Sequence, residues 1–227
     1  MRILALDTAT EACSVALGIG DVEIERYVEV GRGHAEQILP MIQELLAEGG
    51  VTLASLDAIA FGRGPGGFTG VRLAASVAQG LAFGSGVGVV PVSNLAAVAQ
   101  QAWRLQPGLR RLLTVNDARM REVYWAEFEV DGLLNPVGDE HVSAPSEVRL
   151  PAAGAGPWAA AGRGLAVSAE LTGRCRAAGA GVYADLLPRA TDILALARPA
   201  VANGRILPAE AALPVYVRDR VVGAGPS

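Results

Sequence analysis

The sequence contains no lysine, and all 19 of its basic residues are arginines. This absence excludes a Schiff-base lysine, a lysine nucleophile and the lysine of a phosphate-binding P-loop. Cysteine is also scarce. Since Cys13 and Cys175 are the two cysteines of the sequence, we expect neither a disulfide framework nor a cysteine-ligated metal cluster. The two histidines, His34 and His141, lie far apart in the chain, so we expect neither to bind a metal.

Long apolar runs are absent as well. No stretch is long enough to cross a bilayer, and Asp7 and Glu11 interrupt the apolar N-terminal segment, which argues against a signal peptide. We therefore expect a cytoplasmic protein that does not contact membranes.

The formal net charge is −4, which argues against independent binding of nucleic acid, because such binding needs a positively charged surface. The 227 residues, 51% of them hydrophobic, can form one large domain or two small ones.

The first hundred residues show a regular order of strand and helix patterns. Three β-rich segments, "RILALDTA", "ACSVALGIG" and "EIERYVEV", are separated by short turns. Apolar spacing then predicts a helix over 34–48, a strand at "AIAFG", a helix over 69–83 and a strand at "VGVVPV". This order of elements is typical of a ribonuclease-H-like lobe.

The second half repeats the start of the first. Both "ILALDTATEACSVAL" and "LLTVNDARMREVYWAEF" contain a strand that ends at an aspartate, a polar turn and a second strand. Helical patterns follow around 167–178 and 191–202. A repeated lobe indicates duplication, so we predict an α/β protein of two ribonuclease-H-like lobes, residues 1–106 and 107–227. This is the architecture of the actin/Hsp70/sugar-kinase (ASKHA) superfamily.

The loop "GRGPGGFTG" has the G-x-G-x-x-G spacing of a dinucleotide-binding turn. Such a site needs an acidic residue about twenty positions further on. No acidic residue occurs between Asp57 and Asp117, and Pro65 removes one backbone donor from the loop. We therefore expect a tight structural turn and no bound cofactor.

Asp7 and Asp117 stand where actin-like ATPases place their phosphate-binding hairpins. Those hairpins need glycine beside the aspartate so that the backbone can approach phosphates. Here the turns read "DTATEAC" and "DARMREV", so we expect both aspartates to be capping or turn residues. No catalytic, cofactor-binding or metal-binding residue is assigned.

With these residues in view, the chain resembles the TsaB (YeaZ) family of bacteria over nearly its whole length. The resemblance is carried, in order, by "ILALDTATEACSVAL", "GRGHAEQILPMIQELL", "GRGPGGFTGVRLAASVAQGLA", "PVSNLAA", "NDARMREVYWA" and "PVYVR". It implies a non-catalytic subunit in the synthesis of N6-threonylcarbamoyladenosine beside the anticodon of tRNAs that read codons beginning with A. The implied partners are the catalytic paralogue TsaD and the small ATPase TsaE. The resemblance further implies a homodimer when the chain is alone, and contact with tRNA only through the complex.

The catalytic paralogue carries a metal-binding H-x-x-x-H helix after the last strand of its first lobe. By comparison, Asn94 and Val98 stand at the two histidine positions here. Valine cannot bind a metal, and asparagine is a poor replacement for imidazole. The resemblance therefore implies a protein that is not an enzyme on its own.

Helices 34–48 and 69–83 are expected to form the shared surface for self-association and for the paralogue. The alanine stripe of the second helix permits close helix packing. Met41 and Val77 add apolar surface away from the main stripes. The predicted interface residues are Leu39, Ile42, Leu46, Val71, Ala74, Ala75, Ala78 and Ala82.

Two alternatives remain open at this point. The first is an autonomous actin-fold ATPase or kinase. The absence of glycine at the Asp7 and Asp117 turns disfavours it, and tight ATP binding by the isolated protein would support it. The second is a protease that acts on the paralogue. It is disfavoured because the sequence shows no assembled set of nucleophile, base or metal ligands.

Overall fold

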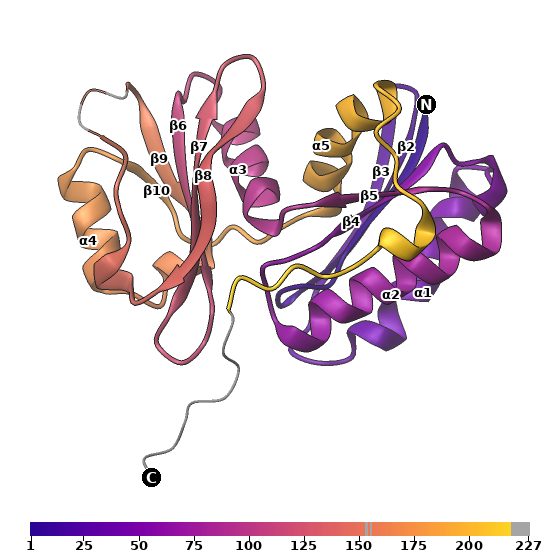
Figure 1. Cartoon of the computed structure of the whole chain (residues 1–227), viewed down its shortest axis with the longest axis horizontal. Helices are drawn as coiled ribbons and strands as arrows, with labels where there is room; N and C mark the ends of the chain where they lie inside the picture. Colours follow the sequence, from indigo (N-terminus) through magenta and orange to yellow (C-terminus); the bar gives the residue numbers. More distant parts are fainter. Residues whose placement is uncertain (153, 155, 219–227) are drawn as a thin grey trace, which may run out of the picture.

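The computed structural model describes residues 1–152, 154 and 156–218, and contains two five-stranded sheets (Figure 1). The first sheet has the order β3-β2-β1-β4-β5. Its strands are β1 (Arg2–Asp7), β2 (Ala12–Ile19), β3 (Val22–Glu29), β4 (Ala58–Gly62) and β5 (Val89–Val92). The second sheet has the order β10-β9-β6-β7-β8. Its strands are β6 (Arg111–Asp117), β7 (Val123–Val130), β8 (Leu134–Ser143), β9 (Trp158–Ala161) and β10 (Gly181–Tyr183).

The two sheets share one topology. In the first, β1, β2 and β3 pair antiparallel, whereas β4 and β5 are parallel to β1. In the second, β6 takes the place of β1, followed by antiparallel β7 and β8 and by parallel β9 and β10. The predicted pair of ribonuclease-H-like lobes is therefore confirmed.

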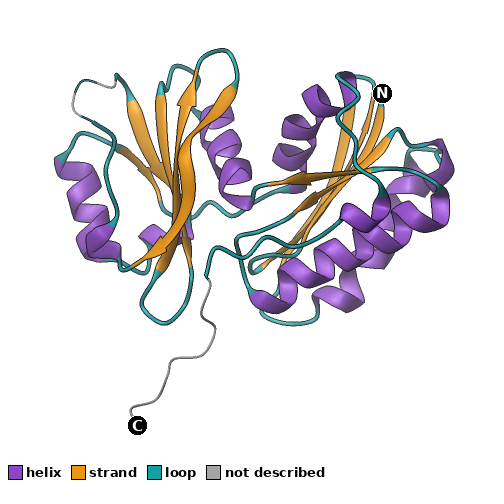
Figure 2. Cartoon of the chain, in the orientation of Figure 1, coloured by secondary structure: helices purple, strands orange, loops and turns teal. Residues whose placement is uncertain are grey.

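Helices cover both faces of each sheet (Figure 2). On the first sheet, α1 (His34–Glu48) and α2 (Phe68–Ser85) lie on one face and α5 (Ala190–Ala202) lies on the other. On the second sheet, α3 (Asn94–Leu105) and α4 (Ala169–Ala177) occupy opposite faces. Short 3-10 turns occur at Leu53–Ser55, Pro145–Glu147, Arg163–Leu165 and Ala209–Ala211.

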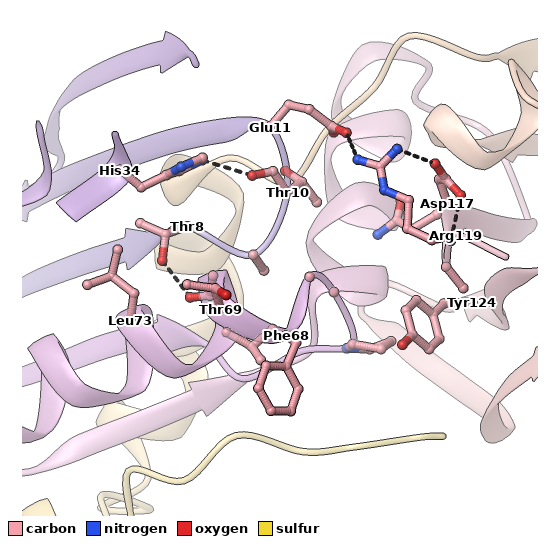
Figure 3. Close-up of a pocket in the computed structure, with 18 of the residues that line it drawn as sticks. Thr8, Thr10, Glu11, His34, Phe68, Thr69, Leu73, Asp117, Arg119 and Tyr124 are labelled. Carbon is pink, nitrogen blue, oxygen red and sulfur yellow. Dashed lines mark hydrogen bonds and ion pairs between the residues drawn. The ribbon is translucent and has the colours of Figure 1, made fainter. Parts of the chain in front are cut away.

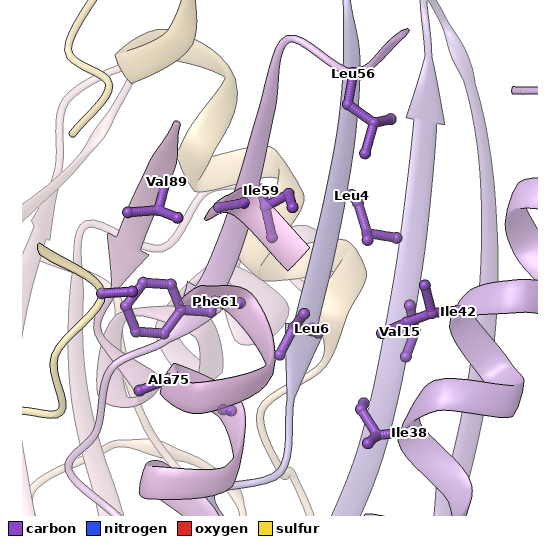
Figure 4. Close-up of a cluster of buried hydrophobic side chains, with 14 of the residues drawn as sticks. Leu4, Leu6, Val15, Ile38, Ile42, Leu56, Ile59, Phe61, Ala75 and Val89 are labelled. Carbon is purple, nitrogen blue, oxygen red and sulfur yellow. The ribbon is translucent and has the colours of Figure 1, made fainter. Parts of the chain in front are cut away.

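Alternation along β1 divides the core of the first lobe between these layers. Leu4 and Leu6 are fully buried under α1 and α2, while Ile3 and Ala5 point to the opposite face, under α5. Figure 4 shows the first of these clusters, in which Ile38 of α1 packs beside the sheet.

Two helices cross between the halves of the chain. Although α3 precedes residue 106, it packs on the second sheet, and α5 returns from the second half to the first sheet. The N-terminus of α5 is anchored there, because Ala190 N–H donates to Ser14 Oγ over 2.6 Å. The predicted limits 1–106 and 107–227 thus separate the strands of the two sheets but not their helices.

The helix predictions agree with the structure to within two residues at each end. The helix predicted over 34–48 has these bounds, and the one predicted over 69–83 spans Phe68–Ser85. The patterns at 167–178 and 191–202 correspond to Ala169–Ala177 and Ala190–Ala202. In the described part of the chain, no helix is long and apolar enough to cross a membrane.

Candidate functional site

The glycine-rich loop between β4 and α2 packs directly on the turn that follows β1. A Cβ atom at Gly62 would lie 2.0 Å from Oδ1 of Asp7, and one at Gly70 would lie 2.0 Å from the carbonyl oxygen of Thr8. Gly67 N–H also donates to the carbonyl of Ala9 over 2.7 Å. Only glycine permits these approaches, which confirms the structural role predicted for the loop.

Asp7 is fully buried at the centre of this contact. Asn94 Nδ2 donates to Asp7 Oδ1 over 2.6 Å, and Asn94 Oδ1 accepts from Gly64 N–H over 2.7 Å. Desolvation by burial outweighs the hydrogen bonds from Asn94 and Ala9 and raises the pKa of Asp7 to about 7. The carboxyl group is therefore linked to the loop through Asn94, and Asp7 is not among the residues that line the cleft described below.

The two positions compared with the metal-binding histidines of the paralogue lie in different surroundings. Both polar atoms of the Asn94 side chain are engaged with Asp7 and Gly64. Val98 is fully buried between α3 and the second sheet. Within the described residues, no cluster of three or more His, Cys, Asp or Glu side chains is placed to hold a metal.

A cavity of about 830 Å³ lies between the lobes (Figure 3). The first lobe lines it with the turn after β1, the N-terminus of α1 and the glycine-rich loop. The second lobe contributes the end of β6, the turn after it and Tyr124, and residues 215–218 complete the rim. Asp117 is a turn residue, as predicted, because its Oδ1 accepts from Arg119 N–H over 2.7 Å.

Arg119 links the two lobes across this cleft. Its Nη2 lies 2.7 Å from Glu11 Oε1 in the first lobe, and its Nη1 lies 2.8 Å from Asp117 Oδ2 in the second (Figure 3). The turn is strained, since Arg119, Met120 and Arg121 all have positive φ angles, of 62°, 52° and 62°. The two turns that hold phosphates in actin-like ATPases are thus joined here by an ion pair.

Asn116 belongs to no motif in the sequence that indicates a site. It ends the apolar run of β6, lines the cavity and is only 3% exposed. Neither Oδ1 nor Nδ2 of its side chain has a hydrogen-bond partner among the described residues. A polar residue at the end of a buried strand was the available signal, but the sequence does not show that this end faces a cleft.

The predicted interface residues lie mostly inside the first lobe. Leu39 of α1 is exposed and Leu46 is half-buried. The other six are buried in the core, namely Ile42, Val71, Ala74, Ala75, Ala78 and Ala82. The expectation that the alanine stripe faces a partner is therefore wrong, because the small side chains let α2 approach its own sheet. Met41 is buried as well, so it adds no outer surface.

The outer face of α2 carries a second series of small residues. Ser76, Gly80 and Gly84 are exposed at intervals of one helical turn, beside Phe83, which is 81% exposed. A Cβ atom at Gly80 or Gly84 would meet nothing within 4 Å. We call these four residues, together with Leu39 of α1, the outer helix face.

Two lobes of equal topology with a cleft between them define a protein of the actin/Hsp70/sugar-kinase architecture. The family model described as TsaD, tRNA N6-adenosine threonylcarbamoyltransferase, matches residues 28–194. The tRNA threonylcarbamoyladenosine biosynthesis protein TsaB of Escherichia coli (strain K12) is 43% identical over 97% of this chain and 96% of its own length. The chain belongs to the TsaB family, and its role lies in tRNA threonylcarbamoyladenosine biosynthesis.

Solved structures agree with this assignment. YeaZ from Pseudomonas aeruginosa is 44% identical, covers 95% of this chain and 99% of that structure, and superposes with a TM-score of 0.85. A second structure from the same organism is described as an uncharacterized protein with similarity to peptidase YEAZ. It is 45% identical, covers 96% of this chain and 99% of that one, and gives a TM-score of 0.86.

Proposed function

We propose that this chain is a non-catalytic activating subunit of a tRNA threonylcarbamoyltransferase complex. It pairs with a TsaD-like catalytic paralogue, works with a TsaE-like ATPase and forms a homodimer when alone. Contact with tRNA occurs only through the complex, in the cytoplasm. The observation that carries the proposal is the outer helix face, an exposed apolar and small-residue surface on α1 and α2 of the first lobe.

The surroundings of Asp7 support the non-catalytic part of the proposal. An actin-type phosphate site needs an aspartate that faces the cleft, whereas Asp7 is fully buried and bonded to Asn94. In addition, Glu11 and Asp117 are both engaged by Arg119. These contacts engage the carboxylates of the two turns, Glu11 and Asp117, within the chain.

The outer helix face supports the proposed pairing with the catalytic paralogue and with a second copy of this chain. At Ser76, Gly80 and Gly84 a partner helix can approach to about 8 Å, the close end of the helix-packing range. The side chains of Phe83 and Leu39 are exposed and apolar, and each contributes roughly 1.5–3 kcal/mol when fully buried. The proposed partner surface is thus the solvent side of the same two helices that the sequence indicated.

Substitution of Gly80 by arginine tests the pairing. Arginine at an exposed helix position is about 1 kcal/mol more favourable than glycine, so Gly80→Arg should fold. It places a bulky charge where the partner helix would pack, so sedimentation should show a monomer and no complex with the paralogue. Gly173→Arg in α4 is the matched control, because Gly173 is also an exposed helical glycine with open space around it.

Reconstituted tRNA modification tests the activating role. The paralogue and the ATPase should form little threonylcarbamoyladenosine without this chain, full product with the wild-type chain or Gly173→Arg, and little with Gly80→Arg. Equal product in the absence of this chain would refute the activating role. Equal pairing by Gly80→Arg and Gly173→Arg would refute the interface.

A further inference from the structure

We propose that Arg72, which lies between the rings of Phe68 and Tyr216, binds a carboxylate side chain of the catalytic paralogue. The inference rests on the pairing proposed above and adds the contact that selects the paralogue over a second copy of this chain. Arg72 is the one charged residue of α2, and it lies one helical turn before Ser76. It therefore continues the line of the outer helix face toward the N-terminus of α2.

Two aromatic rings hold the guanidinium of Arg72 in place. Its Cζ atom lies 3.2 Å from the ring centroid of Phe68 and 4.9 Å from that of Tyr216. The two ring centroids lie 6.3 Å apart, and the two residues remain 56% and 47% exposed. Ring faces attract a cation, but they do not supply the oxygen acceptors that its five N–H donors prefer. The cation is thus positioned at the surface before any partner arrives.

Within the described chain, the donors of Arg72 are almost unused. The guanidinium makes one long hydrogen bond, 3.5 Å from Nη1 to the carbonyl oxygen of Phe68. By contrast, Arg104 and Arg189 are each paired with a carboxylate. The planar fork of arginine matches a carboxylate with two parallel hydrogen bonds. A partner that packs on this end of α2 takes the half-buried Arg72 out of water, so it has to supply an acidic group.

A second copy of this chain is poorly suited to supply that acid. Its α2 contains no aspartate or glutamate. On α1, Glu44 and Glu48 are already paired with Arg26. Glu36 lies in the first turn of α1, where the helix N-terminus already stabilises its charge. Arg72 should therefore favour the heterodimer over the homodimer.

The cluster is distinct from the cavity between the lobes. Phe68 and Tyr216 reach the rim of this cavity, but Arg72 is not among the residues that line it. The ring of Phe68 points away from the ion pair of Glu11 and Arg119 (Figure 3). Binding of a carboxylate by Arg72 therefore does not depend on what occupies the cleft.

The test is calorimetric titration of full-length variants of this chain with the purified paralogue. Arg72→Gln removes the charge and should weaken the heterodimer by about tenfold or more. Arg72→Glu should bind more weakly still, because it places a like charge against the carboxylate of the paralogue. Tyr216→Leu keeps the arginine and removes one ring, so the loss should be roughly twofold to fivefold. Sedimentation should show that all three variants self-associate as the wild type does.

Arg176→Gln in α4 is the matched control, because Arg176 is an exposed helical arginine of the second lobe. It should bind the paralogue as the wild type does, and thermal melts check that each variant folds. Tyr216→Leu leaves α2 unchanged, so it decides the question if Arg72→Gln does not fold.

The outcomes separate this proposal from the pairing itself. A wild-type chain that does not bind the paralogue would refute the pairing, and this proposal with it. If the wild type binds, equal affinities of Arg72→Gln and Arg176→Gln would overturn this proposal alone. The same holds if Arg72→Glu binds no more weakly than Arg72→Gln. Loss of self-association in place of the heterodimer would assign Arg72 to a second copy and would also overturn it.

Discussion

The side-chain amide of Asn94 donates a hydrogen bond to the carboxyl group of Asp7 over 2.6 Å, and thereby joins the start of α3 to the end of β1. Asn94 also accepts from the backbone of Gly64, so one side chain fixes the strand, the helix and the glycine-rich loop. The pair lies in a site without water contact, since Asp7 and Asn94 are both 0% exposed. Its charge state should therefore influence the stability of the whole first lobe.

The free energy of unfolding should decrease as pH rises from about 4 to 7, because Asp7 keeps its proton in the folded state. Its pKa is raised from 3.8 to about 7, so the unfolded chain loses the proton first and gains stability relative to the folded one. The full effect is about 4 kcal/mol. Asp7→Asn, which cannot ionise, should flatten this dependence and be the more stable protein at about pH 8.

Urea denaturation of both proteins between about pH 5 and 8 checks this expectation. The comparison isolates Asp7, because every other titrating group is common to the two chains. Parallel stability curves for the wild type and the variant would show that Asp7 is ionised in the folded protein throughout.

Ala78→Arg should unfold the first lobe. Ala78 is 0% exposed and packs in the core between α2 and the sheet, so the new charge would be buried without a partner. The expected loss is roughly 3–5 kcal/mol, against little change for Gly80→Arg two residues further along the helix. Thermal melts followed by circular dichroism measure the contrast. A folded Ala78→Arg protein would mean that α2 is not held against its sheet.

Removal of the arginine from the Arg104–Asp192 ion pair should destabilise the contact between α3 and α5. Asp192 is 1% exposed, and Arg104 Nε lies 3.0 Å from its Oδ1. Burial raises the pKa of Asp192 although Arg104 acts in the opposite direction. Arg104→Leu should therefore destabilise the protein at neutral pH, by less than the roughly 3–5 kcal/mol of a fully buried pair because the Arg104 side chain is 51% exposed, and the loss should be smaller in acid, where Asp192 becomes protonated.

The double variant Arg104→Leu, Asp192→Leu provides the comparison, because it removes both charges. It should recover most of the lost stability in chemical denaturation at neutral pH. If the double variant is as unstable as Arg104→Leu alone, the loss comes from packing of the arginine side chain and not from the uncompensated carboxylate.

The protein prepared without an affinity tag should contain no stoichiometric transition metal. Both polar atoms of Asn94 are already bonded, and Val98 is buried among apolar side chains. Elemental analysis by mass spectrometry is the measurement. One metal per chain that disappears in Asn94→Ala would contradict this expectation.

The sequence was sufficient for the elements whose periodicity is strong. Helix 34–48 and the repeated strand–turn–strand units are each marked by local patterns, and both sheets follow from them. Local patterns do not show which neighbour an apolar stripe meets. The stripe at Ala74, Ala78 and Ala82 therefore fits a partner helix equally well in the sequence, although in the structure it contacts the sheet of its own lobe.

The candidate site was harder to predict because it is assembled from distant segments. Glu11 and Arg119 meet only when the two lobes face each other, and nothing local to either turn indicates the ion pair. Asn116 resembles any polar residue after a strand until the topology places it in the cleft. Such residues become visible only once the relative position of the lobes is known.

The return of α5 to the first lobe has a consequence for how the protein matures during synthesis. All strands of the first sheet have been made by residue 92, but one of its faces is covered mainly by α5, through residues such as Ile193, Leu194 and Ala197. Until that helix leaves the ribosome, the growing chain exposes an apolar sheet to the cell. The lobe that is translated first is therefore completed last, and chaperones that bind exposed apolar surface should recognise it for roughly half of the time that synthesis takes.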